Sequence, residues 1–267
     1  VVQWIVEQFL NLGCIEGDAE HDSQIVKLLQ RAPTHRTASI LLDQLHGAFD
    51  RAIECILASF QLAGLTELAS YVPIGRHLVA PWKVAVAGAP NVGKSSLVNA
   101  LAGYQRAVVS KVAGTTRDAV AVLLAFDGWP VELIDTAGLR EAGGLEAKGI
   151  ERTRGVLAEA DLVLWVIDSS RPGIAEVSSS KSDLVVWNKC DLVPYSTGLA
   201  VSAKNGAGIP GLVSEIVSRL VPQPPLPGAA VPCTLELADA VEAAYSALLS
   251  GNISEGARLL RDSSTSG

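Results

Sequence analysis

The chain has 267 residues, of which 49% are hydrophobic, 18% charged and 5% aromatic. This composition is typical of a globular protein with one large or two modest domains, and it excludes a disordered chain, a collagen-like repeat and a disulfide scaffold. The net charge of −7 provides no general basic field for nucleic acid. The four cysteines show no CxxC spacing, and no apolar run approaches the roughly 20 residues of a membrane helix. We therefore expect a cytoplasmic protein without membrane contact.

Residues 1–82 have the pattern of helices, and the chain's four histidines lie there without the spacing of a metal site. After Pro33, apolar residues recur at helical spacing and predict one long helix, which Thr34 or Thr37 caps. The apolar face of that helix consists of Leu41, Leu45, Phe49, Ile53, Ile56 and Phe60.

Residues 83–221 alternate short β-rich runs with helical stretches. Six strands are predicted in KVAVAGAP, AVAVLLAF, VELIDTAG, DLVLWVID, DLVVWNK and LAVSAK. The dipeptide Asp127-Gly128 indicates a hairpin between the second and third strands. Helices are expected after Lys94, over residues 146–160 and in IPGLVSEIVSRL. The segment is thus predicted to be an α/β domain with a mostly parallel sheet and one antiparallel strand.

A Pro-rich linker, residues 222–232, follows the α/β domain. Residues 233–267 then predict two short helices that are separated at Gly251. Their apolar face, formed by Val241, Ala244, Leu248 and Leu249, is expected to pack on the first zone. The architecture is therefore an all-α helical domain, residues 1–82 and 233–267, into which the α/β domain is inserted.

The strongest motif is GAPNVGKSS, residues 88–96, between a predicted strand and a predicted helix. It fits the phosphate-binding P-loop pattern G-x-x-x-x-G-K-[ST]. In such a loop, glycines and exposed N–H groups surround the β-phosphate. Lys94 would reach the β- and γ-phosphates, and Ser95 would offer its hydroxyl to Mg²⁺.

Two further loops could complete the phosphate site. GTTRD, residues 114–118, holds Thr115 and Thr116, of which Thr116 could reach Mg²⁺ when the γ-phosphate is present. In DTAGLRE, residues 135–141, Asp135 could hold Mg²⁺ through water, and the N–H of Gly138 could meet the γ-phosphate. Taken alone, the first is an ordinary turn and the second an ordinary strand end.

NKCD, residues 188–191, and SAK, residues 202–204, indicate which base is bound. The Asp191 carboxylate could accept two hydrogen bonds from the guanine edge, whereas adenine would leave this acceptor unpaired. Asn188 would read the other edge, and the Lys189 stem would cover the base. Because all five loops follow strands in the right order, we predict a guanine-nucleotide site at that sheet edge. Its predicted residues are Gly88, Asn91, Val92, Gly93, Lys94, Ser95, Ser96, Thr115, Thr116, Asp135, Gly138, Asn188, Lys189, Asp191, Ser202, Ala203 and Lys204.

The segments PNVGKSSLVNAL, AGTTRD and DTAGLREAGGLEAKGIERT resemble the tRNA-modification GTPases of the MnmE (TrmE) type. The resemblance implies Mg²⁺-dependent GTP hydrolysis that is stimulated by K⁺ and by pairing of two G domains, without an arginine finger. It implies that Asn91 helps to hold K⁺ and that Glu146 orients the attacking water, beside Lys94 and Gly138. An exposed acid in the first turn of a helix remains the alternative for Glu146. Implied partners are a second copy of the chain, tRNA and a flavin-dependent modification protein.

The resemblance is incomplete at both ends of the chain. The family has a longer N-terminal folate-binding domain and a C-terminal motif with a functional Cys, whereas this chain ends RDSSTSG. Cys233 is more typical of a small buried residue. Alternative functions are therefore a GTP-regulated scaffolding switch and a ribosome-assembly GTPase of the Der type. The sequence lacks Met and has short crossovers at 169–182 and 192–198, from which we expect that natural segments are absent.

Overall fold

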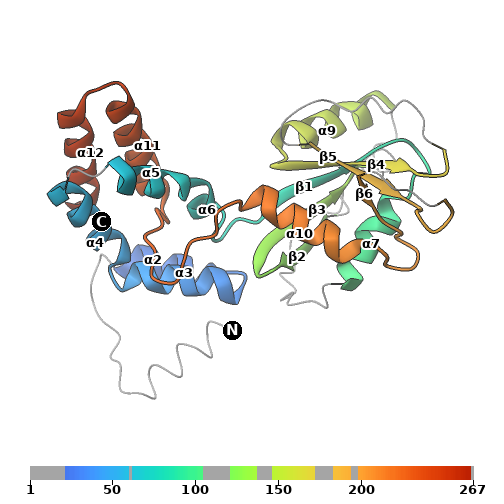
Figure 1. Cartoon of the computed structure of the whole chain (residues 1–267), viewed down its shortest axis with the longest axis horizontal. Coiled ribbons are helices and arrows are strands. Elements are labelled where there is room, and N and C mark those ends of the chain that lie inside the picture. Colours follow the sequence, from blue (N-terminus) through green and yellow to red (C-terminus); the bar gives the residue numbers. More distant parts are fainter. Residues whose placement is uncertain are drawn as a thin grey trace, which may run out of the picture. The chain divides into compact units, whose positions relative to one another are not determined.

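The computed structural model describes six ranges of the chain: residues 22–59, 62–104, 121–136, 146–171, 183–193 and 198–265. Two compact units are present, and each is described by itself (Figure 1). The helical unit comprises Val1–Ala80 and Gln223–Gly267, and the α/β unit comprises Pro81–Pro222. The predicted fold class, an α/β domain inserted into a helical one, is confirmed.

The helical unit packs its N-terminal and C-terminal segments into one apolar core. Phe49 and Ile53 from the first segment share this core with Val241 and Ala244 from the second, and all four are at most 4% exposed. The helices of the unit are α2 (Asp22–Arg31), α3 (His35–Leu45), α4 (Ala48–Ser59), α5 (Leu62–Ser70), α6 (Val72–Arg76), α11 (Leu235–Leu249) and α12 (Ile253–Thr265).

The predicted single helix after Pro33 is wrong, because α3 and α4 are separate helices. The break lies at Gly47, whose φ of 79° is left-handed and ends the helical ladder. Both helices keep a buried apolar face, so the periodicity continues across the break and hides it. The predicted cap is confirmed: Thr34 and Thr37 form a reciprocal capping box at the start of α3. Phe60 lies outside the described residues.

The C-terminal helices also follow the prediction with one exception. They are separated around Gly251, which has a φ of 82°. Leu248 packs against the core, but Leu249 is 68% exposed, so its assignment to the buried face is wrong. Neighbouring residues point about 100° apart on a helix, and at the end of α11 Leu248 lies on the side that meets the core while Leu249 lies on the exposed side.

The α/β unit contains a six-stranded sheet in the order β2-β3-β1-β4-β5-β6. β2 is antiparallel to β3, and every other neighbouring pair is parallel, as predicted. Asp127 and Gly128 both have positive φ, 48° and 80°, as a two-residue I′ hairpin requires. The strands are β1 (Trp82–Ala87), β2 (Ala121–Phe126), β3 (Trp129–Asp135), β4 (Leu162–Asp168), β5 (Asp183–Asn188) and β6 (Leu199–Ala200).

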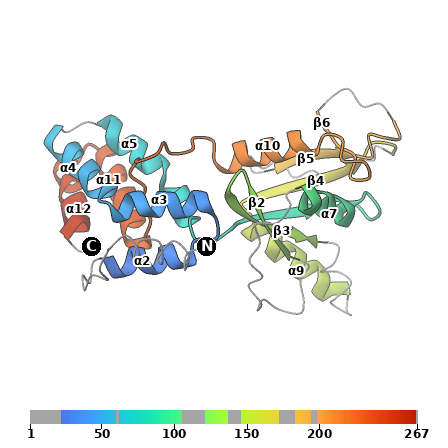
Figure 2. The ribbon, with the colours of Figure 1, turned by 90° about the horizontal axis from the view of Figure 1, so that it is seen from below.

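Helices cover both faces of this sheet (Figures 1 and 2). α9 (Glu146–Glu159) packs on one face, where Val156 and Leu157 meet Ala85 and Val163 of the central strands. α7 (Lys94–Tyr104) and α10 (Ile209–Leu220) lie on the opposite face. Because five strands run parallel, the loops after their carboxyl ends gather at one edge. No helix in the described ranges is long and apolar enough to cross a bilayer.

Candidate functional site

The P-loop joins β1 to α7, and its backbone demands glycine at both ends. Gly88 and Gly93 have φ of 143° and 95°, in the region that side chains rarely adopt. A Cβ on Gly88 would lie 2.3 Å from the carbonyl oxygen of Val166, and one on Gly93 would lie 2.4 Å from Nδ2 of Asn188. The motif glycines are therefore required by contacts with β4 and β5 as well as by the turn itself.

Lys94 places its cationic group against this loop. Its Nζ donates to the carbonyl oxygens of Gly88, at 3.0 Å, and Ala89, at 2.9 Å, and the residue is 7% exposed. The loop is thus wrapped around an ammonium group at the N-terminus of α7, where both the charge and the helix dipole favour an anion.

The two predicted magnesium-binding residues that the structure describes are brought together. Ser95 Oγ donates to Asp135 Oδ2 at 2.5 Å, although the residues come from α7 and from the end of β3. Asp135 is 2% exposed. A hydroxyl and a carboxylate oxygen are the kind of ligands that Mg²⁺ takes in phosphate sites, directly or through water. The pair therefore fits the cation that the P-loop motif implies.

Asn188 uses both ends of its amide to hold two loops. Its Nδ2 donates to the carbonyl oxygen of Val92 at 2.9 Å, and its Oδ1 accepts from the N–H of Ala203 at 3.0 Å. The side chain thereby connects the P-loop with the SAK loop and is 2% exposed. The motif alone assigned Asn188 to the edge of the base and did not disclose this connecting role.

Asp191 lies at the exposed end of the NKCD loop beside the fully buried Ser202. Ser202 Oγ donates to Asp191 Oδ1 at 2.6 Å, and this hydrogen bond lowers the pKa of Asp191 below its usual value. The carboxylate therefore stays ionised at neutral pH and keeps lone pairs for a donor edge of a base.

Lys189 has a left-handed backbone, with a φ of 65°, and its side chain crosses to the P-loop. Its Nζ donates to the carbonyl oxygen of Asn91 at 2.8 Å and to Asp168 Oδ2 at 2.6 Å. Asn91 is itself left-handed, with a φ of 63°, and exposed. Sequence reasoning missed Asp168, because a single Asp at the end of a strand carries no motif.

The remaining predicted residues lie partly within and partly outside the described ranges. Thr115, Thr116 and Gly138 lie outside the described residues. Glu146 is the first residue of α9, as its alternative assignment to the first turn of a helix has it, and its catalytic role stays a prediction. Ser96 follows in α7 and is exposed, and Lys204 is exposed in the loop after β6.

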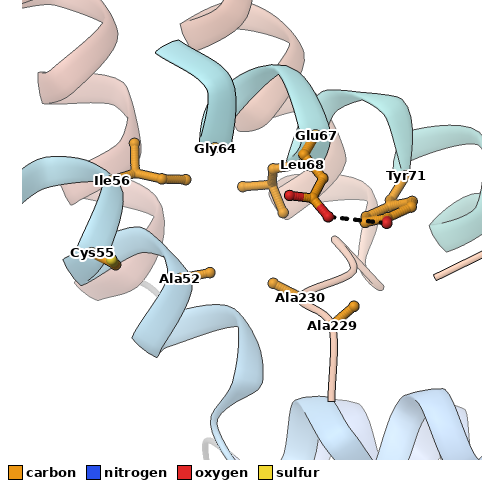
Figure 3. Close-up of a pocket in the computed structure, with 9 residues that line it drawn as sticks. All are labelled: Ala52, Cys55, Ile56, Gly64, Glu67, Leu68, Tyr71, Ala229 and Ala230. Carbon is orange, nitrogen blue, oxygen red and sulfur yellow. Dashed lines mark hydrogen bonds between the residues drawn. The ribbon is translucent and has the colours of Figure 1, made fainter. Parts of the chain in front are cut away.

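The helical unit has a pocket of a different kind, with a volume of about 270 Å³ (Figure 3). Inside it, the Tyr71 hydroxyl donates to Glu67 Oε1 at 3.2 Å, and burial together with the charge of Glu67 raises the pKa of Tyr71. None of the described lining residues is basic, so the pocket offers nothing to a triphosphate. It is lined by Ala52, Cys55, Ile56, Gly64, Glu67, Leu68, Tyr71, Ala229 and Ala230.

Comparison with known proteins finds relatives of the segment that contains the α/β unit. Residues 83–192 match the family model described as 50S ribosome-binding GTPase. The tRNA modification GTPase MnmE of Cereibacter sphaeroides is 45% identical over 141 residues, which cover 52% of this chain and 32% of that protein. The MnmE protein of Aquifex aeolicus is 40% identical over 174 residues, with coverage of 60% and 39%.

Among solved structures, the G domain of the T. maritima FeoB iron transporter is 28% identical, with a TM-score of 0.39, and covers 52% of this chain and 98% of that one. The chain spans only about a third of the length of the curated relatives, 32% and 39% for the two MnmE proteins above. The P-loop, the contact between Ser95 and Asp135 and the similarity to the MnmE proteins lead to one conclusion: the α/β unit is a GTP-binding P-loop GTPase domain, and the chain is homologous over about half its length to the MnmE-type tRNA modification GTPases.

Proposed function

We propose that this GTPase hydrolyses GTP by a mechanism that depends on K⁺ and on pairing of two G domains. The contact between Ser95 and Asp135 carries the hydrolysis part of this proposal, because it puts oxygen ligands for Mg²⁺ at the loop that holds Lys94. The dependence on K⁺ and on pairing is supported by the resemblance of the motif segments to the MnmE-type GTPases. Thr116 would complete the Mg²⁺ site. Bound there, Mg²⁺ would neutralise charge on the β- and γ-phosphates.

Each of four residues of the chain has its own role in this mechanism. Lys94 is held by loop carbonyls at the mouth of the P-loop, from which it can turn to the β- and γ-phosphate oxygens. The N–H of Gly138 would meet the γ-phosphate, and Glu146 would orient the attacking water. Asn91 would help to hold K⁺, because its side chain is exposed while Lys189 fixes its carbonyl group. A monovalent cation there would perform the electrostatic role of an arginine finger.

Guanine recognition rests on the NKCD and SAK loops. The ionised Asp191 would accept from the N1–H and N2–H₂ groups of the base, while Ser202 holds the carboxylate in position. Asn188 would support the base by holding the loops around it, and the stem of Lys189 would cover its plane. An adenine nucleotide would leave Asp191 without its donors, which disfavours it strongly.

The test is steady-state GTP hydrolysis in K⁺ and in Na⁺, with Glu146→Ala and a matched control. We expect K⁺ to raise the rate about tenfold or more, since a preorganised charge at the phosphates is worth at least that much. Glu146→Ala should remove this activity. Glu159→Ala, at the other end of α9, should not. Hydrolysis that is slow, equal in both salts and unchanged in Glu146→Ala would contradict the mechanism and leave a GTP-binding switch.

We further propose that the GTPase acts in the cytoplasm in tRNA wobble-uridine modification, as a homodimer with a flavin-dependent partner. The support is the 45% identity to a relative that is named a tRNA modification GTPase. A role in ribosome assembly is the second candidate, which the 50S ribosome-binding description of the matching family favours. Co-purification of the GTP-loaded protein with tRNA would support the first function, and co-purification with ribosomal subunits would support the second.

A further inference from the structure

Asp168, the last residue of β4, holds Lys189, which belongs to the base-recognition loop after the neighbouring strand β5. Its Oδ2 accepts a 2.6 Å hydrogen bond from Lys189 Nζ, and the two side chains are 13% and 32% exposed. The contact is therefore largely shielded from solvent, unlike the exposed Lys83–Glu159 pair of the same unit. Shielded, hydrogen-bonded charge pairs couple more strongly than exposed ones.

The carboxylate of Asp168 is itself fixed from its other side. Its Oδ1 accepts from the N–H of Ser170 at 2.9 Å and from the Ser170 hydroxyl at 2.6 Å. Burial by itself raises the pKa of Asp168, but the hydrogen bonds from Lys189 and Ser170 outweigh it and lower the pKa to about 2. Asp168 is therefore a fixed anion at neutral pH.

Lys189 is stretched between this anion and the P-loop. Its second hydrogen bond, of 2.8 Å, goes to the carbonyl oxygen of Asn91. Both Lys189 and Asn91 have positive φ without being glycine, a conformation that persists only where the surroundings hold it. The hydrogen bonds from Lys189 to Asp168 and to Asn91 thus join the end of β4, the loop after β5 and the loop after β1.

We propose that Asp168 is a positioning residue for the guanine nucleotide, which acts by anchoring the Lys189 ammonium so that its aliphatic stem stays over the base. The inference rests on the proposed base recognition by the NKCD loop. Asp168 does not touch the nucleotide, and it does not select guanine. Its loss should therefore shorten the residence of every nucleotide that the site accepts, by freeing the Lys189 stem and loosening the P-loop at Asn91.

The experiment measures the dissociation rate of a fluorescent GDP analogue from the full chain and from Asp168→Asn. We expect dissociation to accelerate about tenfold, since a hydrogen bond between charged groups is typically worth that factor. Glu159→Gln breaks an exposed Lys–Glu pair of the same unit and should leave the rate unchanged. The ratio of GDP to IDP affinity should stay constant in Asp168→Asn and change in Asp191→Asn, because only Asp191 faces the 2-amino group.

A double-mutant cycle with Lys189→Met separates positioning from general destabilisation. If Asp168 acts through Lys189, adding Asp168→Asn to Lys189→Met should accelerate dissociation by less than about twofold. Independent effects that multiply, or an unchanged rate in Asp168→Asn, would overturn the inference. Asp168→Ala replaces Asp168→Asn if the latter does not fold. Failure of the unmodified chain to bind GDP would instead refute the proposed function.

Discussion

Each of the two units contains a buried carboxamide that bridges separate segments of the chain, and the two amides differ in what they connect. In the helical unit, Gln44 is 3% exposed; its Nε2 donates to Ala229 O at 3.1 Å, and its Oε1 accepts from Val231 N at 3.0 Å. In the α/β unit, Asn188 is 2% exposed and bridges Val92 and Ala203 in the same manner. Each amide connects chain segments that are far apart in the sequence.

The difference lies in what the connected segments do. Gln44 joins α3 to the segment that enters α11, so its hydrogen bonds close the helical unit across the insertion. Asn188 joins the phosphate loop to the SAK loop, so its hydrogen bonds shape the nucleotide site. Both regions also need a glycine at a close approach: Gly75 against Pro232 O, and Gly93 against Asn188 Nδ2. A buried side-chain amide thus stabilises the fold in the helical unit and shapes the nucleotide site in the α/β unit.

Removal of the Lys94 ammonium group should distinguish the two units most strongly, because the phosphate-binding loop lies in the α/β unit. Lys94→Ala should reduce GTP hydrolysis about 100-fold or more, since one preorganised donor at a developing charge is worth that much. Lys27→Ala, on the exposed side of α2, is the control and should keep full activity. Retained hydrolysis in Lys94→Ala would show that the reaction occurs elsewhere.

In both units, the glycine that lies in close contact with its neighbours should not tolerate an added side chain. A Cβ at Gly75 would lie 2.0 Å from the backbone oxygen of Pro232, and one at Gly93 would lie 2.4 Å from the buried Asn188. Gly75→Ala and Gly93→Ala should each lower the free energy of unfolding by about 3 kcal/mol, and only the second should weaken GDP binding. Gly103→Ala has open space within α7 and should be neutral or slightly stabilising. Urea unfolding followed by circular dichroism and a GDP titration measure both effects.

Truncation of the two carboxamides tests the difference between Gln44 and Asn188 directly. Gln44→Ala and Asn188→Ala should each cost about 2 kcal/mol of unfolding free energy, because buried backbone groups lose their partners. Asn188→Ala should also raise the Kd for GDP, whereas Gln44→Ala should not. Gln30→Ala, on the exposed side of α2, is the control and should change neither quantity. An equal loss of GDP affinity in Gln44→Ala would disprove this division of labour.

The smallest effect concerns acid stability. The pKa of Asp168 is lowered from 3.8 to about 2. A lowered pKa stabilises the folded state above the unfolded pKa, and this contribution is lost as the pH falls toward the folded value. The advantage of the unmodified chain over Asp168→Asn should therefore be at most about 2 kcal/mol above pH 4 and should fade toward about pH 2. The loss of unfolding free energy in Gln44→Ala should not change over this pH range, since an amide does not titrate. A pH-independent difference for Asp168→Asn would contradict the assignment.

Much of the α/β unit could be predicted because its signals are local. Six strands, the hairpin at Asp127-Gly128 and the P-loop each follow from a short stretch of residues whose backbone preferences or anion chemistry are self-contained. The helical unit was harder to predict. The apolar periodicity continues across the break at Gly47 and does not show that Leu249 faces solvent. The break and the exposure of Leu249 both depend on which side of each helix packs against another element.

The order of residues along the chain was sufficient to establish the α/β class, the phosphate loop and a guanine-type base loop, since each is encoded by neighbouring residues. Only the tertiary structure revealed that Asn188 and Gln44 act as connecting amides and that Asp168 anchors Lys189. These partners are between 15 and 187 residues apart in the chain. Their pairing depends on how strands and helices are arranged in space, which no short motif specifies.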